Sequence, residues 1–176
     1  MVRLSEGYQA LLHPYVASKG SFGKAYSRDM AYAASRYTEA KLAPISAELF
    51  ADIDKDTVDF VDNYDATMKE PTLFPVTFPS VLVNANTGIA AGMASSICPF
   101  NLKEVCDTTI AYIKDNDISV ADTLLAPDFP IGGKLLYNRA DMEKIYETGR
   151  GGFKVRGVYT YDKAQNCIDI TEIQIG

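Results

Sequence analysis

The chain has 176 residues, 47% of them hydrophobic, and a net charge of −6 at neutral pH. This length and composition suffice for one large domain or two small ones. No apolar run approaches the roughly 18 residues that a membrane span needs. No signal peptide is visible at the N-terminus. We therefore expect a cytoplasmic protein that does not interact with membranes.

Side chains that bind transition metals are scarce in this sequence. It has one histidine, His13, and three scattered cysteines, Cys98, Cys106 and Cys167, without a C-x-x-C motif. A structural zinc site needs about four such ligands at suitable spacing, so we expect no metal site. The acidic stretch 54–65 lacks the glycine and terminal glutamate of an EF-hand loop. We interpret it as a solvated, turn-forming surface.

The net charge conceals an uneven distribution. Residues 1–41 hold six basic and three acidic side chains, a net +3, while residues 42–176 hold eleven basic and twenty acidic side chains, a net −9. A basic segment joined to an acidic body can still bind phosphates locally. An excess of this size is also ordinary for a protein surface, so charge alone does not indicate a nucleic-acid partner.

The N-terminal part of the chain is predicted to be mostly helical. Residues 1–12 resemble the end of a helix, residues 18–24 a glycine-containing loop, and residues 28–35 a short helix or turn. From residue 39 to residue 53, apolar side chains recur every three or four positions. This period predicts an amphipathic helix, with Pro44 in the first turns, where proline is best tolerated.

A proline-rich stretch, residues 71–79, is the candidate boundary between two domains. Proline stiffens the chain and punctuates regular structure, so we place the domains at 1–70 and 71–176. Beyond this boundary, residues 81–83 are predicted as a buried strand and residues 84–88 as a polar turn.

Two further helices are predicted from their end signals. Asn101 followed by Glu104 resembles a capping box that opens a helix to about Lys114. Residues 141–148 form a second, shorter helix, with Gly149 as its stop. The expected apolar face of the first helix consists of Leu102, Val105, Cys106, Thr109 and Ile113.

The C-terminal part of the chain is predicted to be a β-hairpin. Residues 152–161 and 167–175 are rich in β-branched and aromatic side chains, and the polar turn 162–166 separates them. The predicted fold class is therefore α+β, mostly helical at first and mixed later.

Motifs for most enzyme classes are missing from the sequence. It has no G-x-S-x-G, Walker or dinucleotide-binding motif. With a single histidine, a histidine-dependent triad has almost no basis. Carboxylates are numerous, but nothing selects a pair of them for a hydrolase.

The dipeptide Arg36-Tyr37 is a candidate for phosphoryl chemistry. A phenol with a pKa near 10 is a poor nucleophile. A guanidinium can stabilise both the phenolate and a pentacoordinate phosphate through charge-assisted hydrogen bonds. An isolated Arg-Tyr pair is nevertheless most often an ordinary surface or core pair, so the dipeptide alone leaves both interpretations open.

The sequence around this dipeptide distinguishes the two interpretations. The informative strings are Gly-Ser-Phe-Gly (20–23), Ala-Ala-Ser-Arg-Tyr-Thr-Glu-Ala-Lys-Leu (33–42), Thr-Val-Asp-Phe-Val-Asp-Asn-Tyr-Asp (57–65), Gly-Ile-Ala-Ala-Gly-Met-Ala (88–94) and Tyr-Glu-Thr-Gly-Arg-Gly (146–151). In this order they resemble the breakage-reunion region of the A subunits of DNA gyrase and topoisomerase IV, which are type IIA DNA topoisomerases. The resemblance covers nearly the whole chain.

The resemblance implies specific roles for individual residues. Tyr37 stands where the family's tyrosine attacks a DNA phosphodiester and forms a 5′-phosphotyrosyl link, and Arg36 stands where the transition state is stabilised. Ile89 stands where an isoleucine wedges between base pairs, which suits an apolar side chain at a turn. Further expected DNA contacts, chosen by charge and by position along the chain, are Arg3, Lys19, Lys24, Arg28 and Lys41.

The resemblance also implies an architecture and an assembly. Residues 1–70 correspond to the C-terminal part of a winged-helix domain that carries the catalytic tyrosine, and residues 71–176 to the start of an α/β tower domain. We expect a fragment that is inactive alone. Its expected partners are double-stranded DNA, a B subunit in an A2B2 heterotetramer, and a second copy of the A subunit. Mg²⁺ and ATP are expected on the B subunit, in a chromosome-associated, ATP-dependent enzyme.

Some positions depart from the family pattern. Ser35 stands where methionine is common, and Cys98-Pro99-Phe100-Asn101 replaces a more usual Pro-Pro-His-Asn. The alternative hypothesis is a non-catalytic DNA-binding or interaction module with the same fold. Retention of Arg36, Tyr37 and Ile89 argues against that alternative. The sequence does not separate gyrase from topoisomerase IV.

Overall fold

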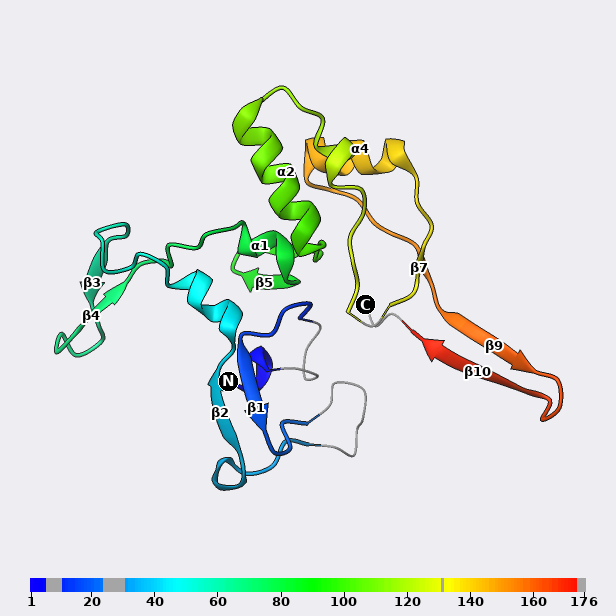
Figure 1. Ribbon diagram of the computed structural model, residues 1–176, viewed down its shortest axis with the longest axis horizontal. Helices are drawn as coiled ribbons and strands as arrows, with labels where there is room; N and C mark the ends of the chain where they lie inside the picture. Colours follow the sequence, from blue (N-terminus) through cyan, green and yellow to red (C-terminus); the bar gives the residue numbers. More distant parts are fainter. Residues whose placement is uncertain (6–10, 24–30, 131, 174–176) are drawn as a thin grey trace. The chain divides into compact units, whose positions relative to one another are not determined.

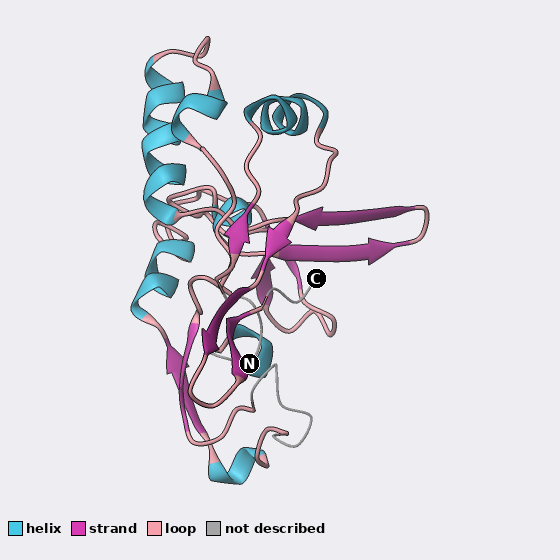
Figure 2. Ribbon diagram, turned by 90° about the vertical axis from the view of Figure 1, so that its right-hand side faces the viewer, coloured by secondary structure: helices cyan, strands magenta, loops and turns pink. Residues whose placement is uncertain are grey.

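The computed structural model describes residues 1–5, 11–23, 31–130 and 132–173 (Figure 1). The chain divides into two compact units, with the division between Ser80 and Val81; the second unit also includes Leu11 and Leu12. Helices and strands both occur in each unit, which confirms the α+β class. The described strands form two-stranded antiparallel sheets (Figure 2). Within the described ranges, no helix is both long enough and apolar enough to cross a membrane.

The first unit is organised by a two-stranded ribbon. Strand β1 (Val16–Lys19) pairs with strand β2 (Glu39–Leu42), in blue and cyan in Figure 1. A 3₁₀ turn, η1 (Val2–Leu4), precedes the ribbon, and the backbone carbonyl of Leu4 accepts a hydrogen bond from Tyr15 N at 3.0 Å. The N-terminal residues are therefore tied to the start of β1.

The helix predicted over residues 1–12 is wrong for residues 1–5, where only η1 is helical. Ser5 forms a parallel bridge with Val16 instead of continuing the helix. Its buried hydroxyl donates to Val2 O at 2.7 Å. A serine hydroxyl that bonds the nearby backbone competes with helical hydrogen bonding, and this explains the early stop.

The amphipathic helix predicted over residues 39–53 is also wrong. Glu39–Leu42 is strand β2, and a 3₁₀ helix, η3 (Pro44–Leu49), follows it. Ala43 has an extended backbone (φ −71°, ψ 153°), because the residue before proline is pushed out of the helical region. Pairing with β1 overrides the helical period of the side chains, since neighbouring strands satisfy the same backbone groups.

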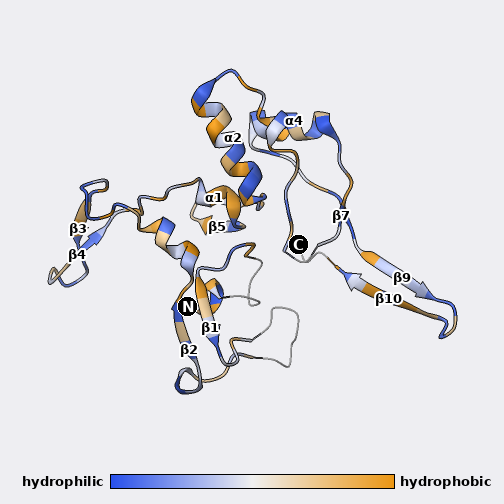
Figure 3. Cartoon of the chain, in the orientation of Figure 1, coloured by the Kyte–Doolittle hydropathy of each residue, from blue (hydrophilic) through white to orange (hydrophobic). Residues whose placement is uncertain are grey.

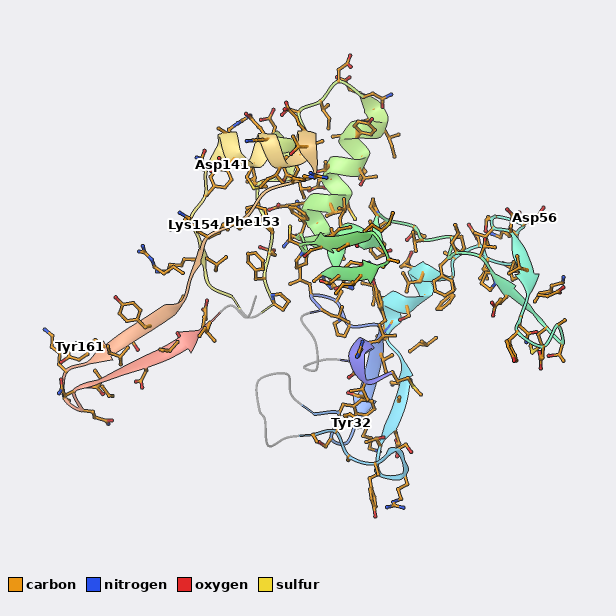
Figure 4. The ribbon with its side chains drawn as sticks, turned by 180° about the vertical axis from the view of Figure 1, so that it is seen from behind. Tyr32, Asp56, Asp141, Phe153, Lys154 and Tyr161 are labelled. Carbon is orange, nitrogen blue, oxygen red and sulfur yellow. The ribbon has the colours of Figure 1, made fainter. Side chains whose placement is uncertain are left out.

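The acidic stretch contains turns and the start of a hairpin. Residues 51–56 are turns, as predicted for 54–56, and Asp56 lies there (Figure 4). Strand β3 (Phe60–Asp62) then pairs with β4 (Lys69–Pro71). Hydrogen bonds from the hydroxyl and backbone of Thr67 stabilise the turn between them. The same bonds hold the pKa of Asp65 below its ordinary value, since they favour the charged carboxylate.

The second unit opens with elements that differ from those predicted. Residues 81–83 are helical, as part of α1 (Ser80–Val83), and the predicted polar turn at 84–88 overlaps strand β5 (Asn86–Ala90). Strand β5 pairs with β6 (Met93–Ile97). A short apolar run does not distinguish a buried strand from a buried helix, and Val83 is indeed fully buried.

Three helices build the core of the second unit: α2 (Leu102–Lys114), α3 (Val120–Thr123) and α4 (Arg139–Thr148). Asn101 caps α2 as predicted, because its Oδ1 accepts from Lys103 N at 3.0 Å. Gly149 ends α4 as predicted, with a left-handed φ of +66°. The buried apolar side chains in and beside these helices are Phe100, Val105, Ala121, Leu124 and Met142.

The buried face of α2 differs in part from the predicted face. Val105 is buried as expected, and Thr108 is buried beside it with its hydroxyl 2.9 Å from Thr123 Oγ1. Ile113 was placed on the buried face, yet 76% of it is exposed. The helix is amphipathic (Figure 3), but the short α3 covers only part of its apolar surface.

The predicted C-terminal hairpin is confirmed, although its first strand begins later than expected. Strand β9 (Val158–Asp162) pairs with β10 (Cys167–Glu172), while β8 (Val155–Arg156) pairs with β7 (Lys134–Leu135). The register places Ile168 opposite Tyr161, which projects from the ribbon in Figure 4. Residues 174–175 of the predicted strand lie outside the described residues.

Packing of the second unit makes a specific prediction for stability. Met142 is 2% exposed and Ile113 is 76% exposed, so both can be replaced by alanine in the same unit as a matched pair. We expect Met142→Ala to lower the free energy of unfolding by about 2–5 kcal/mol, because it leaves a cavity. Ile113→Ala should change it by less than about 0.5 kcal/mol. Urea unfolding followed by circular dichroism measures both; equal effects would contradict this packing.

Candidate nucleic-acid interface

The register of the β1–β2 ribbon gathers charged side chains on one face. Lys19 lies opposite Glu39, and Lys41 lies opposite Ala17. Residues directly opposite each other share a face, and so do residues two apart along a strand. Lys19, Glu39 and Lys41 therefore lie on the same side of the ribbon.

The two lysines on this face differ in their ion pairing. Lys19 Nζ lies 3.3 Å from Glu39 Oε2, and both side chains are largely exposed. Lys41 is exposed and pairs with no carboxylate among the described residues. The charge of Lys19 is thus partly neutralised within the protein, whereas that of Lys41 is available to an anion.

Arg36 and Tyr37 lie in a single 3₁₀ turn, η2 (Ser35–Tyr37), directly before β2. Tyr37 N donates to Ala34 O at 2.9 Å. The backbone N–H and the hydroxyl of Thr38 both donate to Ser35 O, each at 3.2 Å. Hydrogen bonds thus close the turn on both sides of the tyrosine before the strand begins.

The side chains of this turn combine a phenol with a cation. Tyr37 is 70% exposed, and the guanidinium carbon of Arg36 lies 5.2 Å from the centroid of its ring. This separation is within the range of a cation–π interaction. A guanidinium held there is close enough to interact with a phosphate that approaches the phenol, and it can bind phosphate oxygens in a bidentate manner.

Two other described tyrosines, Tyr146 and Tyr64, lie in less suitable surroundings for phosphate chemistry. The hydroxyl of Tyr146 donates to Leu124 O at 2.7 Å, and burial raises its pKa well above that of an ordinary tyrosine. Tyr64 is fully exposed, but it stands between Asp62 and Asp65, whose charges repel phosphates. Tyr37 is instead flanked by Arg36 and lies next to the lysine-bearing ribbon.

Ile89 occupies an exposed position in the second unit. It belongs to β5, opposite Ala94, and 88% of it is exposed. The hairpin turns at Ala91-Gly92, where Gly92 has a left-handed φ of +80°. A large aliphatic side chain at a hairpin end has no packing role there, which is consistent with the expectation that it inserts between bases.

Of the remaining site residues expected from sequence, the structure describes only Arg3. Arg3 is exposed in η1, which is joined to β1 through Leu4 and Tyr15. Lys24 and Arg28 lie outside the residues that the structure describes. In the described part of the chain, no group of three His, Cys, Asp or Glu side chains is arranged to hold a metal ion.

Two features of the site were not predicted from sequence. The carboxylate of Glu39 pairs with Lys19 across the ribbon, and Gly20 lies close to the backbone of Tyr37. The string Gly-Ser-Phe-Gly was a signal for the second feature, but its partner depended on the strand register. Fold and site together define an α+β protein with an exposed tyrosine–arginine pair beside a basic strand face.

Comparison with known proteins assigns this protein to a family. The model of the family of DNA gyrase/topoisomerase IV A subunits matches residues 1–176. The DNA gyrase A subunit of Streptomyces coelicolor is 42% identical over 182 residues, which cover 98% of this chain and 21% of the relative. For the gyrase A subunit of Borreliella burgdorferi, the identity is 38% over 179 residues, covering 98% and 22%. For that of Staphylococcus epidermidis, it is 43% over 159 residues, covering 89% and 17%.

The chain belongs to the family of DNA gyrase and topoisomerase IV A subunits. This confirms the resemblance found in the sequence. The chain spans about a fifth of the length of these relatives.

Proposed function

We propose that this chain is part of the A subunit of a type IIA DNA topoisomerase and that Tyr37 cleaves DNA. The observation that carries the proposal is the exposed phenol of Tyr37 with the Arg36 guanidinium 5.2 Å from its ring centroid, in a chain of this family. Such an enzyme cuts both strands of a duplex, passes a second duplex through the break and reseals it.

The proposed reaction is a transesterification at phosphorus. Tyr37 Oη attacks a backbone phosphate, a phosphorus–oxygen bond forms, and the bond to the 3′ oxygen breaks. The phenol loses its proton, and the departing 3′ oxygen gains one to become a hydroxyl. Arg36 stabilises the extra negative charge on the equatorial oxygens. Religation is the reverse attack, by the 3′-hydroxyl on the 5′-phosphotyrosyl link. Because that link is also a phosphodiester, the energy of the broken DNA phosphodiester bond is conserved in it.

Basic residues near this turn are proposed to contact the DNA backbone. Lys41 and Lys19 share one face of the ribbon, and Arg3 lies on the turn tied to β1. Phosphate contacts of this kind fix the position and register of the duplex without reading its sequence. Lys24 and Arg28 remain proposed contacts on the strength of the sequence.

Ile89 is proposed to insert between base pairs and bend the duplex. Its 88% exposure is the supporting observation. Unstacking a base step costs a few kcal/mol, and a bent duplex repays this cost by contacting more of the protein.

The remaining expectations from the family resemblance become part of the proposal. The first unit contributes to a winged-helix domain and the second to a tower domain. Two A subunits combine with two B subunits in an A2B2 heterotetramer, and the B subunit holds Mg²⁺ and ATP. The enzyme acts on the chromosome in the cytoplasm, and this chain alone is inactive because it lacks these partners.

The proposal predicts a covalent adduct that depends on Tyr37. The full-length subunit, its B partner, Mg²⁺ and DNA are mixed and denatured rapidly, and protein attached to 5′ ends is quantified. We expect Tyr37→Phe to abolish the adduct and the matched control Tyr64→Phe to preserve it. Arg36→Ala should slow cleavage by about 10²–10³-fold, as loss of one oxyanion-stabilising donor does.

Two results of this experiment would contradict the proposal. An adduct that persists in Tyr37→Phe would mean that another group is the nucleophile. The absence of any adduct from the unmodified enzyme, with DNA binding intact, would favour a non-catalytic DNA-binding module.

A second prediction concerns the unequal lysines of the ribbon. Lys41 has no carboxylate partner among the described residues, whereas Lys19 pairs with Glu39 at 3.3 Å. We expect Lys41→Ala to reduce the slope of log affinity against log salt by about one, since each phosphate contact releases about one counterion. Lys19→Ala should reduce the slope by less. Fluorescence anisotropy titrations of DNA at several salt concentrations measure both slopes, and the reverse order would refute the assignment.

A further inference from the structure

Gly20 lies at the end of β1, where the chain approaches the backbone of Tyr37. Its φ of +98° lies in the left-handed region that favours glycine. A methyl group on its Cα would lie 2.8 Å from Tyr37 O, 3.3 Å from Thr38 Cγ2 and 3.4 Å from Thr38 Cα. The closest of these atoms is a backbone oxygen, so a side chain at this position would displace the peptide of Tyr37.

Links on both sides hold this approach in place. Immediately before Gly20, Lys19 pairs with Glu39 in the ladder and through its ammonium group. Immediately after it, Ser21 O accepts from Ala33 N at 2.9 Å. The turn that carries the tyrosine lies between Ala33 and Glu39 in sequence, so it is fixed at both ends to the segment that contains Gly20.

We propose that Gly20 is a positioning residue for the reaction of Tyr37. The absence of a side chain at position 20 lets the β1 end lie against the Tyr37 carbonyl, and this contact sets where the phenol stands. This inference rests on the proposed function of Tyr37. Attack on phosphorus requires the reacting atoms to be about 3–3.5 Å apart and aligned, and a misplacement of about 1 Å can cost about 10²-fold in rate.

A substitution at Gly20 has two effects, one from its left-handed φ and one from its close contact with Tyr37. A matched control at Gly149 separates these effects. Gly149 also has a left-handed φ, +66°, but a methyl group there would meet nothing within 4 Å. Asparagine is among the side chains that best tolerate this backbone region. Gly20→Asn and Gly149→Asn therefore share the mild backbone cost, and only Gly20→Asn creates the clash with Tyr37.

The test uses the full-length subunit with its B partner, Mg²⁺ and a duplex DNA. Three quantities are measured for the unmodified enzyme, Gly20→Ala, Gly20→Asn, Gly149→Asn and Tyr37→Phe. These are the single-turnover cleavage rate at saturating DNA, the Kd for DNA and the unfolding midpoint. We expect both Gly20 variants to lose about 10²-fold in cleavage rate with Kd unchanged. Gly149→Asn should match the unmodified enzyme in rate and Kd.

Several outcomes would overturn the role proposed for Gly20 without contradicting the proposal that Tyr37 is the nucleophile. They are wild-type cleavage by the Gly20 variants, an equal loss of rate in Gly149→Asn, or a weaker Kd with the saturated rate unchanged. If Gly20→Ala fails to fold, Gly20→Asn decides, and loss of folding in both Gly20 variants shows a purely structural role. Failure of the proposed function is seen separately, as no adduct from the unmodified enzyme or an adduct from Tyr37→Phe, and it overturns both claims.

Discussion

The antiparallel register of β1 with β2 is the constraint on which the candidate site depends. It places Lys19 opposite Glu39 and puts Lys41 on the same face of the ribbon. It also brings Gly20 to the carbonyl of Tyr37. A shift of one residue would turn each of these side chains to the other face, since the side-chain period of a strand is two. A local pairing of two short strands thus defines the chemistry available at the turn.

The turn that carries Tyr37 combines an exposed side chain with a fixed backbone and with basic residues nearby. To cleave DNA as proposed, Tyr37 must reach a DNA backbone, so its ring cannot be buried, and it is 70% exposed. Its backbone is nevertheless held, by hydrogen bonds from Tyr37 N to Ala34 O and from Thr38 N to Ser35 O. The net −6 of the whole chain would oppose DNA, and the basic residues at the ribbon counter it locally. A rigid backbone with an exposed side chain is the arrangement that positions a nucleophile without hiding it.

Sequence reasoning succeeded where the signal was local. The Asn101 cap, the Gly149 stop and the final hairpin each depend on neighbours a few residues away, and all three are present. It failed over residues 39–42, which were predicted as helix, because the partner of β2 is β1, far upstream in the chain. The family strings predict Arg36 and Tyr37 as site residues, whereas the Lys19–Glu39 pair and the Gly20 contact required the register. Distant pairing leaves no periodic trace in the sequence, and that is why these features could not be predicted.

We propose that Tyr37, among the eleven tyrosines of the chain, forms the bond to DNA. The most direct measurement is to trap the covalent complex of the full-length enzyme, digest it with nuclease and protease, and locate the nucleotide-bearing peptide by mass spectrometry. We expect a single modified peptide, with the nucleotide attached to Tyr37 through its phenolic oxygen. A nucleotide on any other tyrosine, such as Tyr32 or Tyr64, would contradict it.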